Sequence, residues 1–436
     1  MSQGNHERPI RLLFNRRVMV VLFLSFSSTL PLVLLTGTLQ AWYTAAGVSL
    51  MVIGNLSLLQ YAYLIKFLWA PFMDQYTPLN LGHRRGWILI TQIGLAITLT
   101  LLAFMDPARH PWGIFWLAAG IAFISASQDI GIDGYRANIL RAKERGLGAA
   151  VTTVGGRLAM LVGGGLALIL AADYDWRLTY ICMALLMLAQ IIPTLTTPTS
   201  KKPAPAGTLQ SIIIVPFKEL LTRKYIGMIL LLVLIYKFGD AMALSLNTTF
   251  LMRGVGFTLL ELGYTYKLVS VIASLLGGFA GGFVMPRLGL YCSLLIFGFS
   301  QTVTNLSFMM LALIGKNFTF MIAAIFLDYF CGGLATIAFV AFLIALCNQQ
   351  YSATQYAILS AVMAVGRVMI GPLAAYLVKH MGWTPFYLIT FFAGFPALFI
   401  LWWLRDRIDF NAITLNGSSK ISFQRDTKSG SPKFTT

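Results

Sequence analysis

The stretches Gly155-Gly156-Arg157-Leu158-Ala159-Met160 and Val365-Gly366-Arg367-Val368-Met369-Ile370 each place an arginine inside a long apolar run. The two arginines lie about half of the 436-residue chain apart. An arginine at membrane depth costs at least ~2.5 kcal/mol and needs a partner or a water-filled cavity. Because the costly placement occurs twice, it indicates two related halves around a shared polar pathway, as in transporters.

The composition of the chain requires a membrane. The chain is 58% hydrophobic and 11% charged, with a mean hydropathy of +0.76. A soluble domain cannot bury so much apolar surface, so the bilayer is the expected solvent. The short alternating segments of a β-barrel are missing from the sequence. We therefore predict an all-α membrane protein.

Twelve apolar runs are long enough to cross a bilayer as helices. They are residues 18–42, 48–72, 86–105, 112–135, 148–171, 178–196, 226–252, 258–285, 290–314, 318–347, 355–379 and 383–404. A polar stretch containing Lys201-Lys202-Pro203-Ala204-Pro205 divides them into two groups of six. The predicted parts are an N-terminus (1–17), a six-helix bundle (18–196), a linker (197–225), a second bundle (226–404) and a basic tail (405–436). Within the linker, residues 209–221 are a candidate for an amphipathic interfacial helix.

The distribution of charge predicts the orientation. The net charge is +17, and 22 of the 32 Lys and Arg residues fall on the face that carries both termini. Five fall on the opposite face: Arg109, Arg177, Arg253, Lys316 and Lys379. The positive-inside rule then predicts a multi-pass protein with both termini in the cytoplasm. This arrangement explains the basic charge without a nucleic-acid partner. Residues 1–17 are polar and basic, so no cleavable signal peptide is expected.

Nine ionisable residues lie inside the predicted spans. The cations are Lys66, Arg157, Lys237, Lys267 and Arg367, and the acids are Asp129, Asp133, Asp240 and Asp328. Asp129 and Asp133 are four residues apart and Lys237 and Asp240 three apart, so each pair shares a helix face. Because cations outnumber acids, a cavity lined by these residues would prefer an anionic substrate.

These residues suggest two roles. A carboxylate beside a cation in a poorly hydrated cavity can carry a proton, so Asp129, Asp240 and Asp328 are candidates for proton coupling. The candidates for binding substrate carboxylates are Lys237, Lys267, Arg367 and Lys66.

Simpler interpretations remain open for the N-terminal half. Lys66 or Arg157 could form a neutralised pair with Asp129 that only locks helices together. Asp133 lies three residues before Arg136, and this pair is more readily explained as a gate or helix-end contact.

Uncharged polar residues add further candidates. Tyr61 on the second span and Asn247 on the seventh could bind sugar hydroxyls or amides, although polar side chains in spans also bond to their own helices. The four cysteines and four histidines show no metal-type or catalytic spacing, and no phosphate-binding loop is present. We therefore expect no cofactor, no metal site and no enzymatic activity.

The loop after the second span resembles the signature of the major facilitator superfamily. Asp74 is followed by Gly82-His83-Arg84-Arg85-Gly86-Trp87, although the spacer is longer than usual. The resemblance implies a gating role for Asp74, Arg84 and Arg85, which would bridge helix ends in one of the alternating states. The second-half counterpart, Gly281 to Gly289, lacks the acid. A solvated loop acid is the plainer interpretation of Asp74.

Longer strings resemble AmpG-type muropeptide permeases. They are Pro31 to Trp42, Lys66 to Asp74, Ala126 to Ile130 and Glu144 to Ala150. The resemblance is specific over roughly residues 20–170 and general beyond. It implies a twelve-helix major facilitator fold in a bacterial inner membrane. The implied function is proton-driven import of anhydro-sugar peptides from the periplasm, with lipid as the surrounding partner. Lys66, Asp74 and Asp129 fall inside the matching strings.

Three other functions stay open. Well-known members of that family carry extra C-terminal helices that this sequence lacks, so the cargo could be a siderophore or another anionic metabolite. A membrane receptor that binds the same ligand without transporting it is a less expected alternative, and an enzyme is the least expected.

Overall fold

The computed structural model describes residues 16–407 apart from residue 83, residues 141–144, 197–214 and 349–351. Within these ranges every regular element is a helix, and twelve spans have the length and apolar composition to cross a membrane. The prediction of a twelve-helix membrane protein is therefore confirmed. The structural span limits lie within a few residues of the predicted ones; the first span, for example, runs from Arg16 to Ala45.

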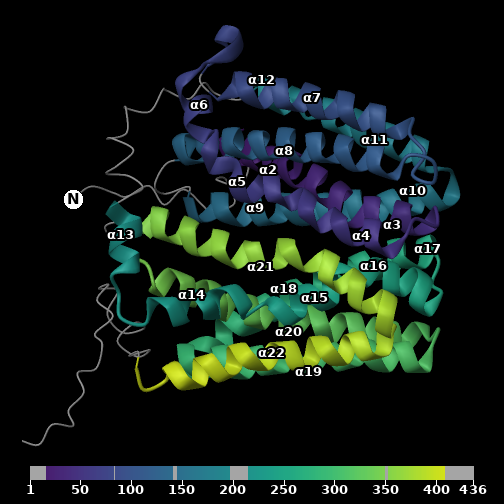
Figure 1. Ribbon diagram of the computed structural model, residues 1–436. Helices are drawn as coiled ribbons and strands as arrows, with labels where there is room; N and C mark the ends of the chain where they lie inside the picture. Colours follow the sequence, from purple (N-terminus) through teal and green to yellow (C-terminus); the bar gives the residue numbers. More distant parts are fainter. Residues whose placement is uncertain (1–15, 83, 141–144, 197–214, 349–351, 408–436) are drawn as a thin grey trace, which may run out of the picture.

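The first six spans form the N-terminal bundle, the upper, purple-to-blue half of Figure 1. Span 1 comprises α2 (Arg16–Val33), η1 (Leu34–Thr38) and α3 (Leu39–Ala45); span 2 comprises α4 (Leu50–Asn55), η2 (Leu56–Gln60), α5 (Tyr61–Ile65) and η3 (Lys66–Leu68). After α6 (Ala70–Gln75) and η4 (Pro78–Asn80), spans 3 and 4 are α7 (Arg85–Ala103) and α8 (Pro111–Ile139). Span 5 comprises α9 (Arg145–Met160), η6 (Leu161–Leu166) and α10 (Ala167–Asp173), and span 6 comprises α11 (Trp176–Ala189) and α12 (Ile191–Thr196).

The C-terminal bundle follows a short helix of the linker, α13 (Val215–Leu221). Span 7 comprises α14 (Ile226–Ile235), α15 (Phe238–Ser245), α16 (Asn247–Thr249) and η8 (Phe250–Val255). Span 8 comprises α17 (Leu259–Glu261), η9 (Leu262–Tyr266) and α18 (Lys267–Leu288). The last four spans are α19 (Leu290–Ile314), α20 (Phe318–Ala345), α21 (Ser352–Met381) and α22 (Trp383–Leu404).

The two bundles repeat one packing scheme. In the N-terminal bundle α2 packs on α9, α5 on α8 and α7 on α11. In the C-terminal bundle the corresponding pairs are α15 with α21, α18 with α20 and α19 with α22. Each pair joins the same positions in the order of spans, which is the pseudo-symmetry expected of two related halves. The repeat that the arginines of spans 5 and 11 indicate is therefore present in the fold.

Glycine permits the closest of these contacts. In α20, a Cβ at Gly333 would lie 2.5 Å from the carbonyl oxygen of Ser274 in α18. A glycine at this position lets the two backbones touch, as is usual at interfaces between membrane helices.

The two ends of the bundles differ, and we name them by the chain segments they carry. The terminal face carries the first turn of α2, the end of α12, α13 and the end of α22, at the left of Figure 1. The far face carries the opposite ends of the spans. Between the bundles, α4 packs on α21, η6 on η9, and α3 on α16 and η8.

Spans 2 and 7 are broken where their lysines lie. In span 7, α14 ends before Lys237, whose backbone (φ −103°, ψ 11°) is not helical, and α15 restarts at Phe238. In span 2, Lys66 begins the 3-10 turn η3 after a non-helical Ile65 (φ −93°, ψ 3°). Irregular backbone at membrane depth is tolerated only where it is buried in protein or lines a cavity. The breaks at Lys66 and Lys237 therefore indicate places where polar groups are buried in protein or face a cavity rather than lipid.

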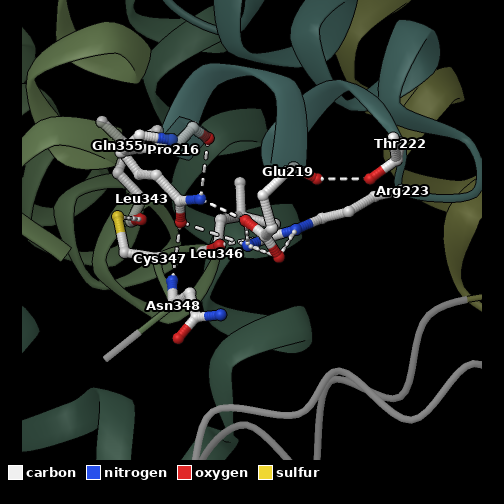
Figure 2. A network of polar contacts seen from close by, with 9 residues as sticks. All are labelled: Pro216, Glu219, Thr222, Arg223, Leu343, Leu346, Cys347, Asn348 and Gln355. Atoms are coloured by element: carbon white, nitrogen blue, oxygen red, sulfur yellow. Dashed lines mark hydrogen bonds and ion pairs between the residues drawn. The ribbon is translucent and has the colours of Figure 1, made fainter. Parts of the chain in front are cut away.

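The linker helix α13 is held against the C-terminal bundle by a polar network (Figure 2). The fully buried Gln355 of α21 donates to the carboxylate of Glu219 and, at 3.2 Å, to the carbonyl oxygen of Pro216. Arg223 binds Glu219 at 2.8 Å and the carbonyl oxygen of Leu346 at the end of α20. The expected linker helix thus exists over residues 215–221; residues 209–214 lie outside the described ranges.

Candidate transport cavity

A cavity of about 420 Å³ lies between the two bundles. Spans 1, 2, 7, 8, 10 and 11 line it, and this size is within the range of small-molecule sites. Its polar lining consists of Thr36, Gln40, Ser57, Gln60, Lys237, Asp240, Ser245, Thr248, Tyr266, Lys267, Thr336 and Arg367. Three of these residues are cations and one is an acid, so the cavity carries a net positive charge.

Lys237 and Asp240 form the most polar wall of the cavity. The Lys237 ammonium lies 3.9 Å from Asp240, 2.6 Å from the amide oxygen of Gln301 and 3.3 Å from the carbonyl oxygen of Gly332. The break in span 7 positions both residues, because Asp240 falls in the first turn of α15. Its second oxygen is buried without a hydrogen-bond partner among the described residues. The pair is therefore only partly satisfied.

Asp328 lies behind this wall, on α20. It is 1% exposed, and the hydroxyl of Thr304 donates to one of its oxygens at 2.9 Å. The other oxygen has no hydrogen-bond partner, and no cation lies within ion-pair distance of the carboxyl in the described part of the chain. A buried carboxyl with one donor and no counter-ion has the surroundings that favour its protonated form.

Lys267 and Arg367 are the cavity cations without an acid. Lys267 lies at the start of α18, and its ammonium is 4.4 Å from the centre of the Tyr266 ring. Arg367 lies in the middle of α21 and lines the cavity. Neither has a carboxylate within 4.0 Å among the residues that the structure describes. Both are therefore free to bind an anionic group.

A second polar cluster lies in the N-terminal bundle, outside the cavity lining. Lys66 is 3.4 Å from Asp129 and 3.7 Å from Asp133, and Ser28 donates to Asp129. Asp133 also accepts from Arg136 at 2.8 Å. The pairs Lys66–Asp129 and Asp133–Arg136 are among those considered from the sequence, and the contact of Lys66 with Asp133 is additional. Together they form one chain of charges from the interior toward the terminal face.

Arg157, one of the two arginines that indicate the repeat, is not part of this cluster. Its guanidinium donates to the sulfur of Met160 at 3.7 Å, and it makes no ion pair with Asp129 among the described residues. Of the two pairings considered for Asp129, the structure forms the one with Lys66.

The candidate gating residues lie at the terminal-face end of spans 2 and 3. Arg84 is 6% exposed and packs on α8, where a Cβ at Gly134 would lie 2.6 Å from its guanidinium carbon. Arg85 donates to the carbonyl oxygen of Leu195 in α12. Asp74 belongs to α6, and its side chain lies outside the described part.

Three predicted substrate-binding residues do not line the cavity in this conformation: Lys66 of the second cluster, Tyr61 and Asn247. Tyr61, on α5, is 41% exposed and is not among the residues that line the cavity. Asn247 is fully buried behind Tyr266, toward whose hydroxyl its amide points at 3.5 Å. Their roles stay predictions.

The far-face end of the cavity is sealed by hydrogen bonds between the bundles. Arg253 of η8 donates to the carbonyl oxygens of Tyr43, Thr44 and Val48 at 3.2, 2.6 and 2.7 Å. Beside it, the Thr44 and Thr249 hydroxyls are 2.9 Å apart. Deeper in the seal, Gln40 donates to the carbonyl oxygen of Ser245 at 3.0 Å.

Sequence reasoning missed several of these residues. Arg253 was grouped with the loop cations of its face, and Gln301 was not singled out because it carries no charge. A glutamine in the interior of an apolar span was the available signal for Gln301, since a buried amide needs partners. No sequence signal marks the partners of Arg253, because they are main-chain carbonyls.

Two six-helix bundles with a positively charged cavity between them have the architecture of a multi-pass membrane transporter. The family model of the Major Facilitator Superfamily matches residues 18–326. The chain is 44% identical over 417 residues to the anhydromuropeptide permease of Escherichia coli (strain K12), covering 95% of this chain and 85% of that protein. It therefore belongs to the AmpG-type permeases of the major facilitator superfamily.

Other similarities agree with this assignment. A putative transporter of Rickettsia felis, AmpG 4, is 30% identical over 404 residues, covering 90% of this chain and 97% of the relative. Among solved structures, a variant of the nucleoside transporter NupG superposes with a TM-score of 0.71 at 14% identity, covering 89% of this chain and all of that one. At that identity the superposition shows the fold alone.

Proposed function

We propose that this protein imports anhydromuropeptide-type fragments of peptidoglycan from the periplasm to the cytoplasm, as a proton symporter of the bacterial inner membrane. The excess of cations in the cavity carries this proposal. Lys237, Lys267 and Arg367 face one acid, Asp240, so a cargo with carboxylates would complete the site. The similarity to a permease named for anhydromuropeptides supports the choice of cargo.

The orientation follows from charge. The terminal face carries most of the Lys and Arg residues, so it is assigned to the cytoplasm and the far face to the periplasm. The Arg253 seal then lies on the periplasmic side, and we assign the structure to a state that is closed on that side. Import consists of loading from the periplasm, formation of this seal and release of cargo through the cytoplasmic face.

Proton coupling is assigned to the acids of both bundles. In the C-terminal bundle, Asp328 holds a proton while Lys237 is engaged with Asp240 and Gln301. A cargo carboxylate that attracts Lys237 would leave Asp240 without its cation and favour its protonation. In the N-terminal bundle, Asp129 would exchange protons with the cytoplasm while Lys66 shifts between Asp129 and Asp133.

Neutral polar groups would bind the sugars. Gln40, Gln60, Ser245, Thr248 and Tyr266 line the cavity and offer both donors and acceptors to hydroxyl and amide groups. The Tyr266 ring adds an apolar face on which a sugar ring can pack.

Uptake by the purified protein in proteoliposomes tests the proposal. With an inward proton gradient, labelled anhydro-disaccharide peptide should accumulate above its equilibrium level, and an uncoupler should remove the accumulation. Empty liposomes are the control. Accumulation that persists in the presence of the uncoupler would contradict symport. Preferential uptake of a labelled siderophore would contradict the assigned cargo. Binding without accumulation would indicate a receptor.

A further inference from the structure

Lys267 crosses from the C-terminal bundle into the N-terminal bundle. It starts α18, yet a Cβ at Gly37 of η1 would lie 3.2 Å from its ammonium nitrogen. A Cβ at Gly164 of η6 would lie 3.2 Å from its Cδ, and one at Gly165 3.6 Å from its Cβ. We call Gly37, Gly164 and Gly165 the glycine cradle of Lys267.

The cradle is built from irregular helix. Gly37 lies in the π-helical turn η1, Gly164 and Gly165 lie in the π-helical turn η6, and the π-helical turn η9 directly precedes Lys267. Such turns are rare and occur mostly at functional sites. Both sides of the interface therefore deviate from regular helix where this lysine crosses it.

The ammonium that the cradle positions has no acid to neutralise it. Lys267 has no carboxylate within 4.0 Å among the described residues, and it lines the cavity beside Gln40 and Tyr266. A cation at this depth without a counter-ion is unfavourable, so a bound anion stabilises it.

We propose that Lys267 in its glycine cradle is a carboxylate subsite that both bundles assemble when the periplasmic side closes. This inference rests on the proposed function and deepens it. When the periplasmic side opens, η1 and η6 move away from η9, and the cradle separates from the lysine. A carboxylate bound there favours closure, because a ligand shifts an equilibrium toward the state in which its site is complete.

Substitution in the cradle tests the assembly without cargo. Spin labels at Ala108→Cys and Lys379→Cys, in a background without the four native cysteines, report the distance between the periplasmic ends of the bundles. Gly164→Val should shift the distance distribution toward the open state, because the new side chain collides with the Lys267 stem. The double variant Gly164→Val with Lys267→Ala should restore the closed distances. Gly282→Val is the control, since no atom lies within 4 Å of a Cβ there.

The carboxylate specificity is tested separately. In the uptake assay, wild type should prefer the anhydro-disaccharide peptide over the same compound with amidated carboxyl groups. Lys267→Ala should reduce that preference about tenfold, as expected for one charge-assisted hydrogen bond. If Lys267→Ala leaves the preference for the free carboxyl groups unchanged, the carboxylate subsite is overturned. If the double variant Gly164→Val with Lys267→Ala does not restore the closed distances, the glycine cradle is overturned. If wild type takes up neither compound while the distances behave as stated, the proposed function fails and the cradle stands.

Discussion

At the scale of single residues, two carboxyl groups of the C-terminal half are buried with incomplete hydrogen bonding. One oxygen of Asp240 and one of Asp328 have no hydrogen-bond partner in the described structure. A buried unsatisfied polar atom costs about 1–3 kcal/mol, and more when it is charged. Protonation or a shift of the Lys237 ammonium removes this cost. The proposed proton coupling would therefore relieve this cost during transport.

The first prediction concerns Asp328. Asp328→Asn keeps the shape and the bond from Thr304 but removes the proton that the carboxyl exchanges. We expect loss of accumulation above equilibrium, with exchange of labelled for unlabelled cargo retained, because exchange needs no net proton movement. Both are measured in proteoliposomes. Asp106→Asn, in an exposed loop, should leave accumulation unchanged. Accumulation by Asp328→Asn would rule out its coupling role.

The second prediction separates the two interpretations of Lys66 and Asp129. In a locking pair, Lys66→Met should inactivate the protein by leaving Asp129 unpaired, and Lys66→Met with Asp129→Asn should restore transport. If Asp129 carries a proton, the double variant should stay without accumulation. We expect the second result, because Ser28 and Lys66 bind Asp129 while Asp133 offers Lys66 an alternative partner. Restored accumulation would establish a structural pair.

At the scale of elements, the seal at the far face, which we assign to the periplasmic side, joins the ends of spans 1 and 7. Within the described structure Arg253 forms no ion pair with an acid; it binds three carbonyl oxygens at the C-terminal end of α3 and the turn beyond it. Helix C-termini carry a partial negative charge, so a guanidinium is favoured there. Because no side chain of span 1 supplies these acceptors, the Arg253 contacts depend on the position of a helix end rather than on a matched residue.

The third prediction follows from this geometry. Arg253→Ala removes every one of these bonds and should shift the protein toward the periplasm-open state, seen as longer distances between labels at Ala108→Cys and Lys379→Cys. Arg253→Lys keeps a cation but loses the fork that reaches several carbonyls, so it should give an intermediate distribution. Thr44→Val keeps the main-chain acceptors and should change the distribution less than Arg253→Ala. Equal effects of Thr44→Val and Arg253→Ala would contradict a main-chain seal.

At the scale of the whole molecule, the sequence predicts the architecture and leaves the contacts between halves unresolved. Apolar length determines the twelve spans, and Arg157 with Arg367 indicates the repeat. Residue spacing also finds Lys237 with Asp240 and Asp133 with Arg136, because each pair is local. Contacts such as Lys267 with Gly164 join residues far apart in sequence. Main-chain acceptors and glycines supply those contacts. A single sequence does not show which of them take part, because every residue has a main-chain carbonyl and glycine has no side chain.

The linker is the other connection between the halves, and in its described part a polar network ties α13 to the C-terminal bundle. Burial by itself would raise the pKa of Glu219, but the hydrogen bonds from Arg223 and Gln355 outweigh it and hold that pKa below its ordinary value. A carboxylate with a lowered folded-state pKa stabilises the fold above its unfolded pKa of about 4.3. That contribution is lost as the pH falls through the folded-state pKa.

The fourth prediction is a pH-dependent loss of stability at this network. Glu219→Gln should lower the Tm in detergent at pH 7, by about 2–4 °C for each kcal/mol lost from a bundle of this size. The difference from wild type should shrink as the pH falls below the unfolded pKa of about 4.3. It should disappear below the lowered folded-state pKa, where the wild-type carboxylate is itself protonated. Asp106→Asn, whose partner Arg109 is exposed, should leave the Tm unchanged at both pH values. A Glu219→Gln difference that persists unchanged in acid would show that shape, rather than the carboxylate charge, holds α13 against α21.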